Sequence, residues 1–331
     1  MSKKEIAIVT INSQNYGNRL QNYALQMILR ELGYEATTLH RNAEDTSIGY
    51  KLKNYFHYIW KVNNTTQFFK FNKLIKWSRK IYKTDIEDLK DKYDFFISGS
   101  DQVWNPFYPF TGTNLDFLIS VESKKRIAYA ASFGVEKLPN EKAEDFKIKL
   151  KDFEKISVRE EAGANIIKNL LGKSVPVVLD PTMLINVEQW RKIEKCPPNM
   201  PKGKYTLVYS VESMSEELKY KVKKEKGMVL EVKKLNGKQW AVGPAEFVYL
   251  IDHAEKMITD SFHGTVFSIL FHTPFVICKR DGINMKSRLD TLLNTFELNG
   301  EITKEKFLNA DRILESKRKE SVRFLKEALA D

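Results

Sequence analysis

The chain contains little cysteine, no long apolar run and no local metal-binding motif. Cys196 and Cys278 are its two cysteines, and they lie far apart. Because no signal-like apolar segment follows the first four residues, we expect a reduced, cytoplasmic protein. No run approaches the roughly 18 apolar residues of a membrane span. CxxC and HExxH are absent, and no DxD signature stands near an expected strand end, so we expect no bound metal or cofactor.

Acidic residues are outnumbered by basic ones. The chain has 54 Lys and Arg against 43 Asp and Glu, a formal net charge of +11. This balance favours anionic partners, which include nucleic acid, an acidic membrane surface and phosphorylated small molecules. Charge alone does not choose among them. A length of 331 residues with 42% hydrophobic residues argues against disorder and indicates two domains.

Strand-like apolar runs alternate with helical patterns along the chain. Residues 6–11 read as a strand, a polar loop follows, and apolar residues then recur at helical spacing up to Gly33. Such alternation predicts an α/β protein with parallel sheets covered by helices. We predict two Rossmann-like domains, with an N-terminal domain over 1–183, a linker over 184–203 and a C-terminal domain over 204–331 that ends in a long helix. A cleft is expected between their facing strand ends.

Residues 50–82 differ from the rest because aromatic and basic side chains are interleaved there. One interpretation is a basic aromatic helical insertion whose aromatics pack on the first domain. The other is a surface that binds nucleic acid or an anionic membrane. The second interpretation predicts peripheral contact with the inner membrane face.

The most informative stretch runs from residue 257 to residue 265. A short apolar run breaks at Asp260 into small and polar residues, then continues at helical spacing. This pattern predicts a strand, a tight turn and a helix start, which is where open parallel sheets bind ligands. His263 lies in the turn, and histidine is suited to proton transfer near neutral pH. The alternative is that His263 only caps the helix.

Three other polar turns follow expected strands. In the first, Gly17 permits a tight turn, Asn18 can cap the next helix and Arg19 would lie near any anion bound there. The second is the small and polar stretch 98–105, which suits a binding loop. In the third, Arg159 ends a strand, where it either binds an anion or forms an ion pair at a helix start.

Six motifs occur in order along the chain: Gly17-Asn18-Arg19-Leu20-Gln21, Ser98-Gly99-Ser100-Asp101-Gln102-Val103-Trp104-Asn105, Ala128-Tyr129-Ala130-Ala131-Ser132-Phe133-Gly134, Ser157-Val158-Arg159-Glu160, Leu179-Asp180-Pro181-Thr182 and Thr259-Asp260-Ser261-Phe262-His263-Gly264-Thr265. Together they resemble the polysaccharide pyruvyl transferase family, from about residue 6 to the region of residue 288. The resemblance implies a fold similar to GT-B glycosyltransferases. It also implies phosphoenolpyruvate as donor, a lipid-linked or nucleotide-linked sugar as acceptor and a pyruvate ketal as product. The segment 50–82 matches no motif of the family.

Ketal formation needs a proton donor, a base for the sugar hydroxyls and cations for the phosphate and carboxylate of the donor. The resemblance assigns the catalytic roles to His263 and Arg159, with no metal. We assign donor binding to Ser261, Gly264, Thr265, Lys279, Arg280 and Arg288. We assign acceptor binding to Gly17, Asn18, Arg19, Ser100, Asp101, Gln102 and Trp104. Asp101 and Asp260 are also candidates to orient the histidine, or only to cap their turns.

Two other functions remain open from the sequence. The same fold serves glycosyltransferases that use a nucleotide sugar, and fold does not fix function. A basic, non-catalytic module that binds polyanions or membranes through residues 50–82 is the third possibility. It predicts salt-dependent binding and no effect of changing His263.

Overall fold

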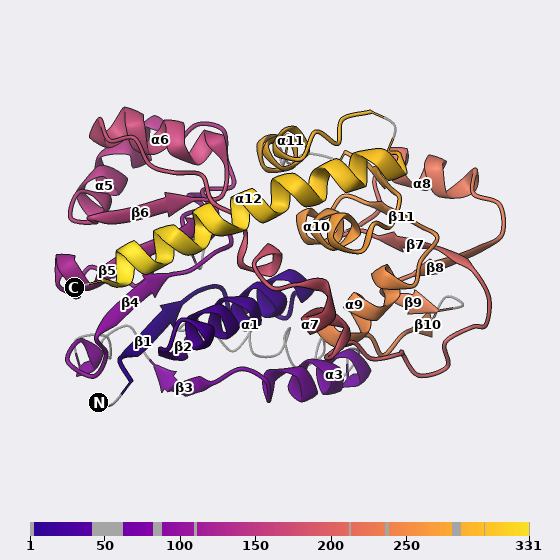
Figure 1. Ribbon diagram of the computed structural model, residues 1–331, viewed down its shortest axis with the longest axis horizontal. Coiled ribbons are helices and arrows are strands. Elements are labelled where there is room, and N and C mark those ends of the chain that lie inside the picture. The colour runs from indigo at the N-terminus through magenta and orange to yellow at the C-terminus, as the bar shows by residue number, and fades with distance from the viewer. Residues whose placement is uncertain are drawn as a thin grey trace.

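The computed structural model describes residues 3–41, 62–81, 88–108, 111–211, 213–235, 238–279, 286–300 and 302–330. It contains two six-stranded sheets, each with helices on its faces (Figure 1). The predicted α/β class with two Rossmann-like domains is confirmed. None of the helices in these ranges is both long and apolar enough to cross a membrane.

The first sheet is parallel throughout and has the strand order β3-β2-β1-β4-β5-β6. Its strands are β1 (Glu5–Val9), β2 (Glu35–Arg41), β3 (Trp77–Ile81), β4 (Phe95–Ser98), β5 (Arg126–Ala131) and β6 (Lys155–Val158). Strand order reverses between β1 and β4, so the loops that follow these two strands leave the sheet on opposite sides and open a crevice.

The second sheet has the order β10-β9-β8-β7-β11-β12, with a short antiparallel hairpin at one edge. Its strands are β7 (Tyr205–Tyr209), β8 (Met228–Glu231), β9 (Lys234–Leu235), β10 (Lys238–Gln239), β11 (Lys256–Thr259) and β12 (Phe275–Ile277). Here the order reverses between β7 and β11. The crevice of this domain therefore lies beside the turn that carries His263.

Ten α-helices and two 3₁₀ turns lie in the described residues. They are α1 (Tyr16–Glu31), α3 (Val62–Asn72), α5 (Asn140–Leu150), α6 (Glu161–Leu171), α7 (Val187–Arg191), α8 (Glu216–Lys223), α9 (Pro244–Asp252), α10 (Phe262–Phe271), α11 (Lys286–Thr295) and α12 (Lys304–Leu329), with 3₁₀ turns η1 (Ser123–Lys125) and η2 (Pro181–Met183). Asn15 caps α1 and Ser261 caps α10, each through its side-chain oxygen. Both caps lie at the crevices, so they fix the first turns of the two helices that flank the site.

The two domains share one apolar core. Tyr16 of α1 stacks on Phe247 of α9, with ring centroids 4.8 Å apart, and also contacts Tyr209 of β7. Figure 1 shows α1, α9 and α10 between the two sheets. This packing holds the two crevices close together.

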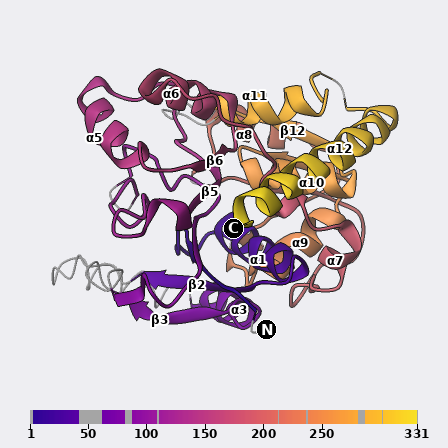
Figure 2. The ribbon, with the colours of Figure 1, turned by 60° about the vertical axis from the view of Figure 1, so that its left-hand side comes forward.

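The terminal helix α12 contacts both domains. α12 starts beside α10 and α11 and then crosses to the first domain, as both views show (Figures 1 and 2). Arg318 donates to the carbonyl oxygens of Met183 and Ile185, at 2.6 and 3.0 Å. Tyr34 donates to the carbonyl oxygen of Leu329. The C-terminal half of α12 therefore packs on the first domain, while the predicted division at 183 and 204 stays a prediction.

The segment 50–82 is only partly described, and the part up to residue 61 lies outside the described residues. Residues 62–72 form α3, in agreement with a helical segment. Trp77–Ile81 is instead the edge strand β3, paired with β2. Phe68 and Phe71 are buried in the shared core, as the packing interpretation expects, whereas Phe69 is 58% exposed.

Candidate active site

Arg159 follows β6 and is buried in a ring of acidic side chains. Its Nη1 donates to Asp180 Oδ2 at 2.8 Å. Its Nη2 lies 3.6 Å from Asp101 and its Nε lies 4.0 Å from Glu160, both without a hydrogen bond. Burial alone would lower the pKa of Arg159, but the three carboxylates outweigh burial and raise it. The guanidinium is thus a permanent cation whose Nε–Nη2 edge makes no hydrogen bond to the described part of the chain.

Asp180 links Arg159 to the other domain. It caps η2 by accepting from the backbone N–H and the hydroxyl of Thr182. Its Oδ2 also accepts from Ser100 at 2.8 Å and lies 3.6 Å from His263 Nε2. Burial would raise the pKa of Asp180, but the nearby imidazole and the guanidinium hold it well below its usual range. Asp180 therefore stays ionised between the two basic groups.

His263 lies in the first turn of α10, at the crevice of the second sheet. Its imidazole is nearly buried, and Nε2 makes no hydrogen bond to a described residue. Phe262, the preceding residue, stands between the two basic groups: its ring centroid lies 4.4 Å from the Arg159 guanidinium and 5.3 Å from the imidazole. The structure thus brings His263 and Arg159 together around Asp180 and Phe262.

Gly17 packs directly against His263. A Cβ placed on Gly17 would stand 2.0 Å from His263 Nδ1, closer than any real contact. Only glycine leaves room for the ring. The first turn of α1 therefore fixes the position of the imidazole, which the sequence alone had not indicated.

We expect Gly17→Ala to remove most turnover while α1 stays folded. Alanine is the better helix former by up to about 1 kcal/mol, so the damage comes from displacing the ring, and a misplacement of about 1 Å can cost about 10²-fold. Initial rates and urea unfolding measure the two effects. In a His263→Ala background, where there is no ring to displace, Gly17→Ala should not lower the free energy of unfolding. Parental turnover in Gly17→Ala would show that the ring position is irrelevant.

A pocket opens between the domains beside this group. Arg159, Asp180, Phe262 and Arg288 line it, with Thr291 of α11 and Lys317 of α12. Arg288 is buried, and its guanidinium lies 6.0 Å from the Phe262 ring. Burial, together with the charge of Arg159, lowers the pKa of Arg288 to about 10. Two buried guanidinium groups on one pocket suit an anionic ligand.

The model of one protein family, described as polysaccharide pyruvyl transferase, matches residues 15–282. The chain belongs to the polysaccharide pyruvyl transferase family. No curated protein matches the chain significantly.

Solved structures resemble the fold. A glycosyltransferase from Rickettsia africae has a TM-score of 0.53 at 12% identity, over 100% of both chains. A putative UDP-N-acetylglucosamine 2-epimerase from Listeria monocytogenes has a TM-score of 0.52 at 10% identity, over 100% of this chain and 92% of that one. Identities this low show the fold alone, which is the GT-B arrangement expected of the family.

In this pyruvyl transferase family member, the residues assigned to donor binding are not all at the pocket. Arg288 lines it. Ser261 and Thr265 use their hydroxyls to hold the turn: Ser261 Oγ accepts from the Gly264 N–H, and Thr265 Oγ1 donates to the Ser261 carbonyl. Lys279 is exposed and its backbone N–H donates to Glu217 of α8. Arg280 lies outside the described residues.

Among the residues assigned to acceptor binding, Ser100, Asp101 and Asn18 form the wall beside Arg159. Asn18 Nδ2 donates to Asp101, whose backbone has a φ of 83°. A positive φ is strained for a residue other than glycine, and such strain clusters at functional sites. Gln102 bonds to Asn105 and Tyr108 beside this wall.

Trp104, which we assigned to acceptor binding from the sequence, lies in the core of the first domain. It is fully buried, stacks on Phe117 at 5.5 Å and contacts Phe133 and Phe153. Its aromatic partners come from distant segments, so the abrupt change from polar to aromatic marks the start of a core layer rather than a binding surface. Asp260 accepts from the Ser210 hydroxyl and the Val211 N–H, so it ties the turn after β11 to the segment after β7.

Asp180 and Lys317 were not assigned roles from the sequence. The motif Leu179-Asp180-Pro181-Thr182 could have indicated a role for Asp180, because a carboxylate between an expected strand and a proline lies at a strand end. Lys317 lies within the long charged helix α12, and nothing local distinguishes it from its neighbours. It reaches the pocket because α12 crosses both domains.

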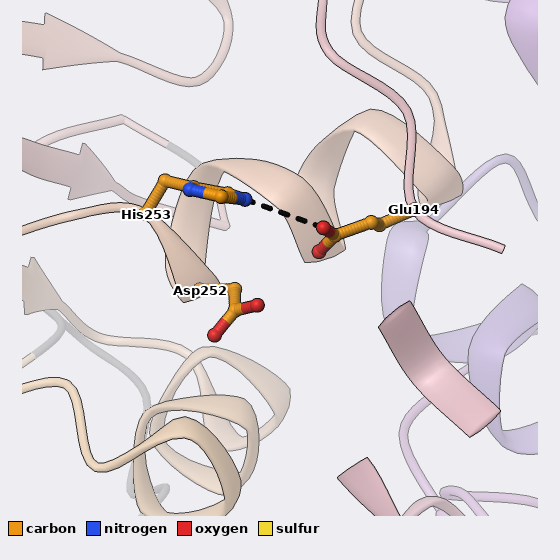
Figure 3. A group of neighbouring side chains, drawn as sticks. All are labelled: Glu194, Asp252 and His253. Atoms are coloured by element: carbon orange, nitrogen blue, oxygen red, sulfur yellow. Dashed lines mark hydrogen bonds and ion pairs between the residues drawn. The ribbon is translucent and has the colours of Figure 1, made fainter. Parts of the chain in front are cut away.

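Another group of chelating side chains, none of which lines the pocket, lies where the segment after α7 meets the end of α9 (Figure 3). Glu194, Asp252 and His253 lie close together, and His253 Nε2 is 3.2 Å from Glu194. Arg191 holds both oxygens of Asp252, at 2.8 and 3.0 Å. The group is explained as an ion-pair network that ties α7 and its following turn to the end of α9.

Proposed function

We propose that this protein transfers a pyruvyl group from phosphoenolpyruvate to two hydroxyls of a sugar in a surface-polysaccharide precursor, forming a ketal. The observation that carries the proposal is the pairing of buried guanidinium groups, Arg159 and Arg288, on one interdomain pocket next to His263. Membership of the family supports the reaction class.

The donor carries a phosphate and a carboxylate, and both need cations in a pocket that excludes water. The Nε–Nη2 edge of Arg159 can hold one of them with two parallel hydrogen bonds. Arg288 supplies the second cation. Asp180 and Ser100 hold Nη1 of Arg159, which fixes the direction of the Nε–Nη2 edge; this edge faces Glu160 and Asp101 without a hydrogen bond to either.

The reaction needs one proton at carbon 3 of the donor and the removal of two hydroxyl protons from the sugar. Protonation at carbon 3 makes carbon 2 electrophilic, one hydroxyl oxygen attacks, and the carbon–oxygen bond to phosphate breaks. The second hydroxyl closes the ketal. His263 delivers the proton to carbon 3 and is recharged by the proton of one hydroxyl, because an imidazole near neutral pH can do both. The proton of the other hydroxyl leaves with the phosphate, which departs as hydrogen phosphate. Arg159 and Arg288 neutralise the leaving phosphate.

The test is incubation with phosphoenolpyruvate and a panel of lipid-linked and nucleotide-linked sugars. Phosphate release and a mass gain of one pyruvate minus one water on the same sugar would support the proposal. Release of a nucleoside diphosphate from a nucleotide sugar, without consumption of phosphoenolpyruvate, would favour a glycosyltransferase instead.

We also propose peripheral contact with an anionic membrane face through α3 and the turn after it. Phe69 and Leu74 are 58% and 40% exposed there, and Lys70 and Lys73 are exposed beside them. Apolar side chains flanked by lysines suit a lipid–water boundary.

Lys70→Gln with Lys73→Gln is expected to weaken binding to anionic vesicles, by about 1 kcal/mol for each lysine. Turnover on a water-soluble acceptor should not change. Vesicle flotation measures the binding, and Lys142→Gln with Lys147→Gln, on exposed positions of α5, is the charge-matched control. Parent protein that stays free of vesicles at low salt contradicts this contact.

A further inference from the structure

Arg19 is a buried cation with unused hydrogen-bonding capacity. The residue is 6% exposed. Its Nη2 donates to the backbone carbonyl of Asn12 at 2.9 Å, whereas Nε and Nη1 make no hydrogen bond to a described residue. No acidic side chain forms an ion pair with it in that part of the chain. It therefore differs from Arg159, whose charge is balanced by three carboxylates.

The position of Arg19 makes this charge costly for the free protein. It lies in the first turn of α1, where the helix dipole is positive and disfavours a cation, and no acidic residue stands in that turn. Burial lowers its pKa to about 10. A buried charge is normally paired, because its lost hydration must be replaced. An anion bound at this place would offset the dipole, the burial and the missing hydrogen bonds together.

Other basic and aromatic groups lie around Arg19, on the edge strands β2 and β3. The Trp77 ring centroid lies 5.1 Å from the guanidinium and 5.5 Å from the ring of His40. His40 pairs with Lys80 across the two strands. Burial lowers the pKa of His40, and the positive charges of Lys80 and Arg19 lower it further. The two positive charges, of Arg19 and Lys80, thus act on the same imidazole, and two cations suit an anion with more than one charge.

We propose that Arg19, with Trp77, His40 and Lys80, binds the diphosphate group of the sugar acceptor. Arg19 and Gly17 lie in the same turn of α1, and Gly17 touches His263. Residues two apart on a helix face opposite sides, so an acceptor anchored at Arg19 would pass across the first turn of α1 to reach the imidazole. Assigning the anion to the acceptor rests on the proposed function; the anion site itself does not. Lipid-linked and nucleotide-linked sugars share this diphosphate chemistry.

The test is a titration of the full chain with inorganic pyrophosphate, without phosphoenolpyruvate, followed by calorimetry and by the ring-proton resonance of His40. A His40→Gln variant identifies that resonance, which reports on this site and not on the Arg159 pocket. Binding should shift the resonance. Arg19→Gln should abolish the shift and weaken binding about 30-fold or more, with Arg19→Lys in between. Lys76→Gln, which removes an exposed charge paired with Glu35, should bind as the parent does.

Two diphosphate esters then identify the source of the anion. UDP-N-acetylglucosamine represents a nucleotide-linked acceptor, and farnesyl diphosphate in detergent represents a lipid-linked one. A His40 shift with either ester, lost in Arg19→Gln, supports the proposal and names the class. Binding of pyrophosphate but of neither ester overturns the assignment to the acceptor. Equal pyrophosphate affinity in the parent and Arg19→Gln overturns the site. None of these outcomes depends on turnover, so failure of the proposed reaction would be recognised separately.

Discussion

His263→Ala is expected to lower turnover by about 10²–10⁴-fold, the usual contribution of a general acid–base group, without unfolding the protein. Removing the imidazole takes one neighbouring cation from Asp180, which keeps its hydrogen bonds to Arg159, Ser100 and Thr182, so the fold should persist. Steady-state rates of phosphate release measure the loss, and circular dichroism checks the fold. Binding of phosphoenolpyruvate should change little, because the guanidinium groups remain.

The matched control for His263 is His272→Ala. His272 ends the same helix and lies 3.0 Å from Asp311 of α12, outside the pocket. This variant should keep parental turnover. Near-parental turnover in His263→Ala would instead show that the residue only caps and packs the turn.

Arg159→Lys is expected to lower kcat/KM for phosphoenolpyruvate by about 10²–10³-fold, mainly through weaker donor binding. Lysine keeps the positive charge that Asp180 and Asp101 require, so the variant should fold. It lacks the planar fork, and an ammonium is a point charge that cannot hold a phosphate or carboxylate with two parallel bonds. Direct titration with the donor separates this binding loss from an effect on chemistry.

Arg159→Ala should bind the donor more weakly than Arg159→Lys, and it should also be less stable. It would leave buried carboxylates without their cation, and breaking a buried pair costs about 3–5 kcal/mol, so urea unfolding should detect the change. Arg126→Lys is a suitable control, since this buried arginine does not line the pocket and donates to the carbonyl oxygens of residues 119 and 121. If Arg159→Lys binds the donor as the parent does, Arg159 is not a donor ligand.

The positions of the polar turns at the ends of expected strands were sufficient to predict that these turns lie at one site. Each turn that follows β1, β4, β6 and β11 reaches the crevices, because parallel strands carry their carboxyl ends to the same edge of a sheet. Arg159 and His263 meet there although 104 positions separate them. Local sequence could predict this, since the periodicity and turn residues that define each unit are local.

What the sequence could not predict depends on contacts between distant segments. Trp104 is fixed by aromatic residues near positions 117, 133 and 153, and no local pattern shows that these form one layer. The course of α12 depends on the hydrogen bonds of Arg318 to the carbonyl oxygens of residues 183 and 185, which are more than 130 positions away in the sequence. β3 is a short, basic edge strand. Edge strands often carry charged side chains, so its sequence lacks the apolar pattern by which a central strand is predicted. The closeness of Gly17 and His263 likewise follows only from docking two domains.

The central claim is that this site protonates phosphoenolpyruvate at carbon 3 and passes its pyruvyl group to a sugar. Transfer carried out in heavy water, with the product examined by mass spectrometry, tests it most directly. We predict that phosphate and ketal appear in equal amounts, that each new methyl group carries one deuterium, and that His263→Ala forms neither product at a comparable rate. Phosphate released without a gain of mass on the sugar, or a ketal methyl group without deuterium, would contradict the account.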